Sequence, residues 1–328
     1  MALDADRRAQ LERARAVALL TQCFDLSPSA TPTAAPFGIT VRDGDQAWIV
    51  SMSSDLAALG GVLVWLDRHG PATAELVVDH HAAVHARRTE VLAPELRVWE
   101  SQGDTVIEAV PEPLLPALPR PDDIAHLEEL LIDEGLEIVC EDGIVRGELA
   151  GLEVARILHG PDGPVLEAGV GRFDREAAAL LHAGGSPADA LHDAVTQVRP
   201  HRTPGAVSHA VNRLGRERWL RHLVVQDPRL AGVSLPELVE PIPPRTNLLE
   251  AAPAALLAVD GDARVLVVCS VGVDLGLVPA IADLVSVHVP TEIRIVMPER
   301  DRLPYVERLA ARLPVPTSFR SINAPWVD

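Results

Sequence analysis

The sequence contains no lysine, so all 29 of its basic residues are arginine. Schiff-base chemistry, pyridoxal phosphate attachment and phosphate binding by a P-loop lysine all require a lysine amine. The missing residue therefore excludes these three classes of site. A GC-rich coding sequence favours arginine, alanine, valine, glycine and proline, and it explains this composition without reference to any activity.

Cysteines and long apolar runs are also scarce. Cys23, Cys140 and Cys269 are odd in number and far apart, whereas disulfide frameworks and zinc ribbons need paired cysteines. No apolar run reaches the roughly 18 residues of a membrane span. The first twenty residues begin charged and build no signal-peptide core. We therefore expect a cytoplasmic protein.

Basic residues are fewer than acidic ones, 29 against 47, which gives a formal net charge of −18. Such a chain repels phosphate backbones over about 8–10 Å in ordinary salt, which disfavours bulk nucleic-acid binding. One basic stretch, between Arg199 and Arg221, is where a local nucleic-acid contact is expected. Its alternative interpretation is a solvated face with Trp219 as a core anchor. Other partners are unknown, and homo-oligomerisation is left open.

The chain is long enough, at 328 residues with 48% hydrophobic residues, for substantial cores in two or three domains. Two proline-rich stretches, at 111–121 and 235–253, divide it, and no regular element is predicted within them. We predict an α/β fold in about three modules. These are an N-terminal α/β module (1–115), a nuclease-like module with trailing helices (122–235) and a C-terminal Rossmann-like module (254–328). No internal repeat is evident.

Hydrophobic patterns place the elements within each module. The first module is expected to alternate strand and helix and to end in a hairpin, with Ser53 or Ser54 capping a helix that ends at Gly70. The middle module reads as a helix, four strands and further helices, an αβββα pattern at its centre. In the last module, strands at 263–270, 292–299 and 317–322 alternate with two helices. This βαβαβ order predicts a parallel sheet.

The stretch "DHHAAVH" begins at Asp79, where a predicted strand ends. His81 and His85 would share one face of a following helix, so a divalent-metal site is one interpretation. The stretch resembles the DHH phosphoesterase family, and Asp55 matches the first aspartate of an upstream family motif. The second falls on Ala57. The alternative is a helix entry capped by Asp79 with surface histidines, and the missing partners favour it.

A hairpin in the middle module carries Glu153 and Glu167 inside apolar strands. A carboxylate in such a strand costs several kcal/mol unless it is paired or binds a metal. Two of them on adjacent strands invite either arginine partners or a cation. A structural Glu–Arg network on a sheet is therefore one interpretation of this hairpin.

The order of helix, strands, carboxylate strand, carboxylate strand and helix resembles the RecB-like branch of the PD-(D/E)xK nucleases. That resemblance implies that Glu153 and Glu167 hold a divalent ion, Mg²⁺ or Mn²⁺, which polarises a phosphodiester and activates water. Glu129, or its neighbour Glu128, would complete the ligand shell. The motif lysine falls on Gly169. Arg172 could reach the site, but arginine stays protonated and cannot act as a base.

The C-terminal module places Ser270, Gly272 and Asp274 where a strand gives way to a helix. Backbone amides at such a turn can cradle an anion. The spacing departs from G-x-G-x-x-G, and Asp274 puts negative charge where a phosphate would sit. A tight turn beside a buried Cys269 is the alternative.

Two functional hypotheses follow, and whether the protein is an enzyme stays open. The first is a divalent-metal-dependent, nuclease-like phosphodiesterase, either active or degenerate, in which Glu153, Glu167 and Arg172 are catalytic and Glu153, Glu167 and Glu129 hold the metal. The second is a non-catalytic binding or regulatory protein that senses a small anionic ligand or nucleotide through Ser270, Gly272 and Asp274. The segments "GLEVARI", "GVGRFDREA" and "VNRLGRERWLR" of the middle module also resemble an uncharacterised family of GC-rich bacteria, which implies no function.

Overall fold

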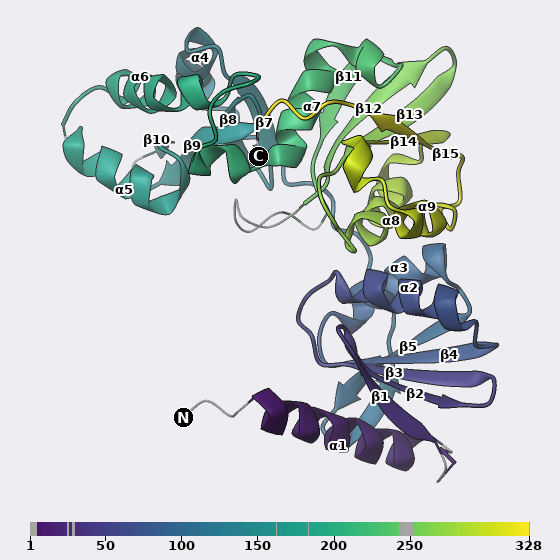
Figure 1. Ribbon diagram of the computed structural model, residues 1–328. Coiled ribbons are helices and arrows are strands. Elements are labelled where there is room, and N and C mark those ends of the chain that lie inside the picture. Colours follow the sequence, from purple (N-terminus) through teal and green to yellow (C-terminus); the bar gives the residue numbers. More distant parts are fainter. Residues whose placement is uncertain are drawn as a thin grey trace. The chain divides into compact units, whose positions relative to one another are not determined.

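The computed structural model describes residues 5–24, 26–27, 30–161, 163–182, 184–242, 244 and 252–327. Over these residues the chain is an α/β protein with sheets of six, four and five strands (Figure 1). The predicted α/β class is confirmed, and three sheets are consistent with three modules. The predicted module boundaries stay predictions.

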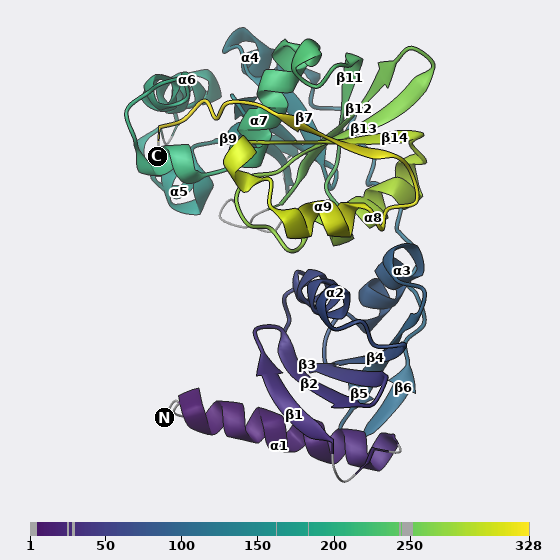
Figure 2. The ribbon, with the colours of Figure 1, turned by 45° about the vertical axis from the view of Figure 1, so that its right-hand side comes forward.

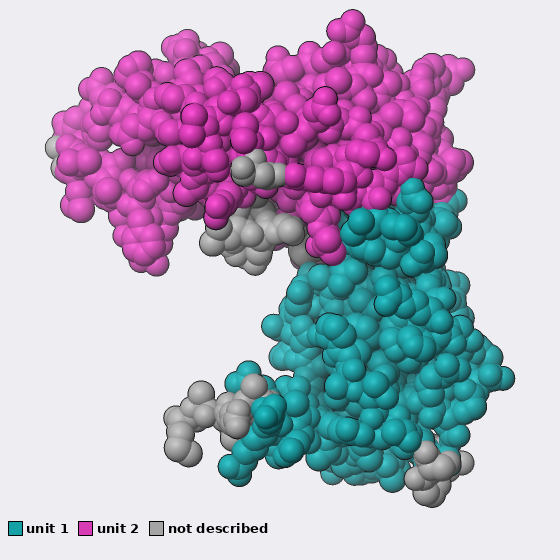
Figure 3. All heavy atoms as spheres, in the orientation of Figure 1, with its two compact units in different colours: residues 1–114, 275–286, 303–314 teal, residues 115–274, 287–302, 315–328 magenta. Residues whose placement is uncertain are grey.

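By its contacts, the chain groups into two compact units, which Figure 3 colours separately. Unit 1 holds residues 1–114, 275–286 and 303–314, and unit 2 holds 115–274, 287–302 and 315–328. Each unit is described by itself below. No helix of the described residues is both long enough and apolar enough to cross a membrane.

The six-stranded sheet of unit 1 combines parallel and antiparallel strands. Its order is β1 (Thr31–Ala35), β2 (Gly38–Asp43), β3 (Gln46–Ser51), β4 (Thr73–Val78), β5 (Leu96–Gln102) and β6 (Thr105–Glu108). Strands β3, β4 and β5 are parallel, and the other neighbours are antiparallel. Helix α1 (Ala5–Cys23) lies on one face, and the crossover helices α2 (Ala58–His69) and α3 (Ala82–Leu92) lie on the other (Figure 2).

The predicted strand–helix alternation of this module is confirmed, but the predicted helix cap is wrong. Helix α2 begins at Ala58, beyond Ser53 and Ser54, and Ala57 stands at its N-cap without a side-chain bond. Asp55 Oδ1 instead accepts a hydrogen bond from the Ala57 amide at 2.8 Å, so the serines belong to a turn before the helix. The helix ends at His69, and Gly70 follows it as the C-cap, as predicted, with a left-handed φ of 52°.

The four-stranded sheet of unit 2 is antiparallel, in the order β10 (Gly163–Ala168), β9 (Leu152–Gly160), β8 (Ile144–Leu149) and β7 (Glu137–Glu141). Helices α4 (Ala125–Asp133), α5 (Gly171–Leu181) and α6 (Pro187–Val198) surround it, and α7 (Arg216–Gln226) follows. Each of these elements matches a predicted one. A core that includes Leu131, Leu152, Leu191 and Val195 joins α4 and α6 to the strands.

The five-stranded sheet contains the predicted βαβαβ unit. Its order is β11 (Ser234–Val239), β12 (Ala254–Asp260), β13 (Ala263–Cys269), β14 (Glu292–Met297) and β15 (Thr317–Ser321). Strands β13, β14 and β15 are parallel, and α8 (Leu277–His288) and α9 (Pro304–Ala310) connect them along the chain. Short 3₁₀ turns lie at η1 (Arg199–His201), η2 (Ala210–Arg213), η3 (Pro228–Leu230) and η4 (Glu299–Asp301).

Strand β11 corrects the expectation that the second proline-rich stretch forms no regular element. It contains Pro236 and pairs with β12 at the edge of the sheet, with a register shift between Ser234 and Glu237. Leu235 has a φ of 50° within this irregularity. Proline lacks an N–H and is tolerated on an edge strand or at a bulge, and both conditions hold here. Residues 243 and 245–251 of the stretch lie outside the described residues.

An internal repeat is visible in the topology, although the sequence does not reveal one. The order β2–β3–α2–β4–α3–β5 returns as β12–β13–α8–β14–α9–β15, each an antiparallel hairpin followed by parallel βαβαβ strands. At the end of the first parallel strand, "SMSSDL" from Ser51 corresponds to "SVGVDL" from Ser270. Each segment ends two residues before the next helix.

Within unit 1, reciprocal ion pairs join the helices of the two repeats. On one side, Arg88 Nε of α3 donates to Asp283 Oδ2 of α8 at 2.8 Å, and Arg87 Nε donates to Oδ1 at 3.0 Å. On the other, Arg312, just after α9, donates to Asp67 of α2 at 2.7 Å. Each repeat thus supplies arginines to the other repeat's aspartate.

Candidate anion-binding pocket

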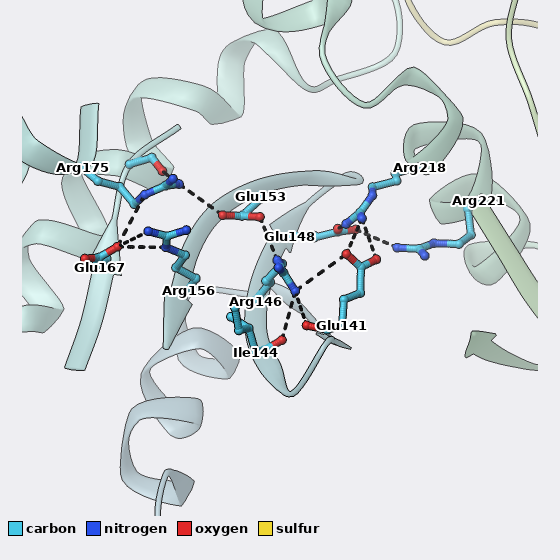
Figure 4. Close-up of polar contacts among 11 residues, drawn as sticks. Glu141, Ile144, Arg146, Glu148, Glu153, Arg156, Glu167, Arg175, Arg218 and Arg221 are labelled. Atoms are coloured by element: carbon cyan, nitrogen blue, oxygen red, sulfur yellow. Dashed lines mark hydrogen bonds and ion pairs between the residues drawn. The ribbon is translucent and has the colours of Figure 1, made fainter. Parts of the chain in front are cut away.

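Glu153, the central residue of the predicted nuclease site, lies between two arginines. Its Oε2 accepts from Arg146 Nε at 3.1 Å, and its Oε1 accepts from Arg175 Nη1 at 3.2 Å (Figure 4). Glu153 is only 6% exposed. In the β8–β9 register, Arg146 is opposite Arg156 and Glu148 is opposite Glu153, with a register shift between the two pairs. Helix α5 supplies Arg175. Both oxygens of Glu153 are therefore occupied by guanidinium groups.

The ion pairs continue inward as a buried network. Arg146 Nη1 donates to the Glu141 carbonyl at 2.7 Å, and Arg218 Nη2 lies 2.5 Å from both carboxylate oxygens of Glu141. Arg218 also bonds to Glu148, whose second oxygen accepts from Arg221 Nη2 at 2.9 Å. Figure 4 shows this alternation of charges running from the hairpin to α7. The bonds of Arg218 span 70 and 77 residues of the chain, so the network connects β7, β8 and β9 to the distant helix α7.

The pKa is shifted in opposite directions for Arg218 and Arg175, which lie at the two ends of the network. Burial alone would lower the pKa of Arg218, but Glu148 and Glu141 raise it above its ordinary value. At the outer end, burial lowers the pKa of Arg175, and neighbouring Arg156 lowers it further against Glu153 and Glu167. Arg218 is thus fully compensated by carboxylates, whereas Arg175 is not.

A cavity of about 460 Å³ adjoins the Arg175 end of the network. Strands β9 and β10 and helices α5 and α6 provide its walls, with Arg156, Glu167, Arg172, Arg175 and Glu176 as its charged lining. Small and aliphatic residues make up most of the remainder. The volume falls within the roughly 300–1,000 Å³ of ordinary small-molecule sites.

The charged lining has an incomplete set of partners. Arg156 Nε and Nη2 both lie 2.9 Å from Glu167 Oε2, and Arg172 Nε lies 2.6 Å from Glu176 Oε1. Arg175 Nε lies 3.6 Å from Glu167 Oε2 and is a buried atom without a hydrogen-bond partner in the described part of the chain. A desolvated donor of a charged guanidinium therefore lies beside the cavity.

The other residues expected at a metal site are not brought together. Glu167 is in the cavity wall, but Glu129 is exposed on α4, and Glu128 is bonded to Arg120. Arg172, expected to assist catalysis, is largely exposed and paired with Glu176. Among the residues that the structure describes, no group of three or more His, Cys, Asp or Glu could hold a metal ion.

The C-terminal turn already holds a carboxylate from its own chain. The amide of Gly272 donates to Asp301 Oδ2 at 2.8 Å, in the place expected for a bound phosphate, and Asp274 also has polar interactions. Ser270 is 1% exposed, with no hydrogen-bond partner found for its Oγ within the described ranges. Burial raises the pKa of the Cys269 thiol to about 12. These features fit the tight turn and buried cysteine.

The histidine stretch leads into helix α3, as preferred, but two details of that interpretation are wrong. Asp79 does not cap the helix, because it binds Arg15 at 2.7 Å and Ser101 at 2.5 Å. His81 takes the N-cap position with a φ of 58°. His85 is 2% exposed rather than a surface residue, because the inward face of α3 carries it into the interior of unit 1.

The basic stretch between Arg199 and Arg221 turns much of its charge inward. Arg202, Arg218 and Arg221 are buried, and the Arg202 guanidinium lies 4.3 Å from the centre of the Trp219 ring. Trp219 is a core residue, as its alternative interpretation predicted. Because these three arginines are buried, their guanidinium groups are not accessible for a nucleic-acid contact.

The sequence predicts arginine partners for the hairpin carboxylates as one interpretation, but it does not identify which arginines these are. Arg146, Arg175 and Arg218 come from β8, α5 and α7. Alternation in "IVRGEL" and "LEVARIL" could not have paired Arg146 with Glu153, because Arg146 is opposite Arg156 and a register shift follows before Glu148 meets Glu153. Nothing local points to Arg218, because its partners lie 70 and 77 residues away.

Comparisons of the chain with protein-family models, with curated proteins and with solved structures returned no match. The assignment of function therefore depends on the chemistry of the cavity and its network.

Proposed function

We propose that this protein is a non-catalytic binding protein that holds a small organic anion in the cavity between β10, α5 and α6. One observation carries the proposal: three arginines and two glutamates line the cavity, so its wall has one surplus positive charge. Each lining arginine has a carboxylate partner, but a surplus charge shielded from water is costly. A bound anion would balance that charge.

The surplus persists over the whole ion-pair network. Its arginines are Arg146, Arg156, Arg175, Arg218 and Arg221, and its carboxylates are Glu141, Glu148, Glu153 and Glu167. Five positive charges thus stand against four negative ones in a chain whose net charge is −18. This local reversal of sign favours an anionic ligand over a cationic one.

The binding role differs from the sequence-based hypothesis in its location. At the anion site expected around Ser270 and Gly272, the Gly272 amide already donates to the carboxylate of Asp301. At the cavity, Arg175 Nε has no hydrogen-bond partner among the described residues. These two observations favour the cavity as the ligand site.

The metal-dependent phosphodiesterase remains the alternative. Mg²⁺ or Mn²⁺ would have to displace Arg146 and Arg175 from Glu153, and removing one partner of a buried ion pair costs roughly 3–5 kcal/mol. The existing pairing of Glu153 therefore supports the binding role over the catalytic one.

Calorimetric titration with sodium acetate, inorganic phosphate and MnCl₂ tests the proposal. We expect an anion to bind the wild type and Arg229→Met, a control for an exposed arginine paired with Asp227. In Arg175→Met the same anion should bind at least about tenfold more weakly, since a charge-assisted hydrogen bond contributes roughly 1.5–3 kcal/mol. Circular dichroism checks that the variants fold.

Two outcomes would contradict the proposal. Equal anion affinity in wild type and Arg175→Met would remove the cavity as the site. Stoichiometric Mn²⁺ binding that disappears in Glu153→Gln would restore the phosphodiesterase hypothesis and justify an assay for phosphodiester hydrolysis.

A further inference from the structure

The cavity has a charged end and an apolar end. Glu167 and Val165 lie on β10 two residues apart, so they share a face and are separated by about 6.6 Å. On α5, Arg175 is followed one turn later, about 5.4 Å along the axis, by Ala178 and Ala179. All five line the cavity.

The charged residues of β10 and α5 lie at the same end of the cavity, and so do their apolar residues. Arg175 lies next to Gly169, just beyond the end of β10, since its Nη1 is 3.5 Å from the Gly169 carbonyl. Helix α5 contacts β10, and Ala178, Ala179 and Val165 line the same cavity. We place the alanines toward Val165 because Arg156 and Arg175 both pair with Glu167.

Helix α6 adds to the apolar end through Pro187 and Ala190, and β10 adds Leu166. Helix α5 buries none of its residues, so its cavity-facing alanines have no other apolar partner to cover them fully. An aliphatic group in the cavity would remove this surface from water and gain roughly 25 cal/mol per Å² of apolar area.

From this arrangement we infer that the ligand is a monocarboxylate with a short aliphatic body. Its carboxylate binds Arg175 and Arg156, and its body lies along Val165, Ala178 and Ala179. A single negative charge matches the single surplus positive charge of the lining. At the other end the lining contains His182, which is already paired with Asp193, so a second carboxylate would lack an unpaired cationic partner there. The inference rests on the proposed function and names the class of anion.

A chain-length series tests this inference. The sodium salts of acetate, butanoate, hexanoate and octanoate are titrated calorimetrically, with the dianion hexanedioate as the charge control. We expect the Kd to fall about fourfold per methylene, the equivalent of roughly 0.8 kcal/mol, until the apolar end is filled. Hexanedioate should bind at least about tenfold more weakly than hexanoate, because burying its second carboxylate unpaired costs more than 1.4 kcal/mol.

Two matched variants of α5 locate the aliphatic body. Ala179→Leu reduces the apolar end of the cavity, and Ala177→Leu makes the same change at an exposed position outside its lining. We expect Ala179→Leu to weaken octanoate while acetate binding is unchanged. Ala177→Leu should reproduce the wild-type series.

The outcomes separate the inference from the proposed function. If acetate binds but the Kd does not depend on chain length, or if hexanedioate binds best, the cavity is an anion site and the monocarboxylate inference fails. If none of these carboxylates nor inorganic phosphate binds, the proposed function fails as well.

Discussion

Acid should destabilise unit 1 through His85. This side chain is 2% exposed on α3, and its Nδ1 has no hydrogen-bond partner among the residues described. Burial, and then the positive charges of Arg88 and His81, lower its pKa from 6.5 to about 4. The imidazole is therefore neutral in the folded protein at neutral pH, and protonating it in place is unfavourable.

The direction of the effect follows from the lowered pKa. As the pH falls, the unfolded chain takes up the proton near pH 6.5, before the folded chain does, so stability decreases with decreasing pH. The contribution is complete above pH 6.5 and is lost progressively toward pH 4. A shift from 6.5 to about 4 corresponds to roughly 3 kcal/mol in total, of which about 2 kcal/mol is lost by pH 5.

Urea denaturation at pH 7.5 and pH 5.0 measures this loss. The wild type should lose about 2 kcal/mol more unfolding free energy between the two pH values than His85→Leu, which has no group to protonate. His80→Leu, a change at the exposed neighbouring histidine, should behave like the wild type. Equal losses in wild type and His85→Leu would refute the reasoning, because groups common to both proteins cancel in the comparison.

Three further predictions concern other buried groups. Asp283→Asn should lower the unfolding free energy by roughly 3–5 kcal/mol, because Arg87 and Arg88 both lose a charged partner; a urea titration that shows less than 1 kcal/mol would contradict this. Gly151→Ala should lower the Tm, since φ is 76° and a Cβ would lie 2.3 Å from the Arg218 backbone, whereas Gly44→Ala, also at positive φ but in open space, should lower it less. Cys269, at 0% exposure with its pKa raised to about 12, should react with a thiol reagent only after unfolding, and a native thiol count of three would rule this out.

Much of the fold could be predicted because hydrophobic period and turn residues act locally. The helix that ends at Gly70 and the apolar strand before Asp79 are examples, and the structure contains both. Strand β11 could not be predicted by the same means, because Pro236 opposes a strand locally and only its place at the sheet edge permits one. The register shift there is a property of the assembled sheet.

The candidate site was predictable in part. An apolar strand with a central glutamate requires a partner, and Glu153 was expected to have either arginines or a cation. The choice between them depended on Arg175 and Arg146, which reach Glu153 from different elements. The cavity itself depends on how α5 returns along β10, and no residue pattern in the chain specifies that path.

The repeat could not be recognised from the sequence, because its two copies share their topology but little of their sequence. The two copies share their element order and the segments beginning at Ser51 and Ser270, but the chain between these elements is free to differ. Parallel strands need apolar residues and helix starts need turn residues, and many sequences satisfy both. The similarity is therefore in topology rather than in composition.

The interleaving of the two units has a consequence for synthesis on the ribosome. Unit 1 begins at the first residue and is finished only with the segment that ends at Pro314, about 200 residues after Leu114. At roughly 5–20 residues per second, translation of that interval takes about 10–40 s. During this time the first βαβαβ repeat has been synthesised without α8 and α9. Arg87 and Arg88 therefore lack their partner Asp283 until that residue has been translated.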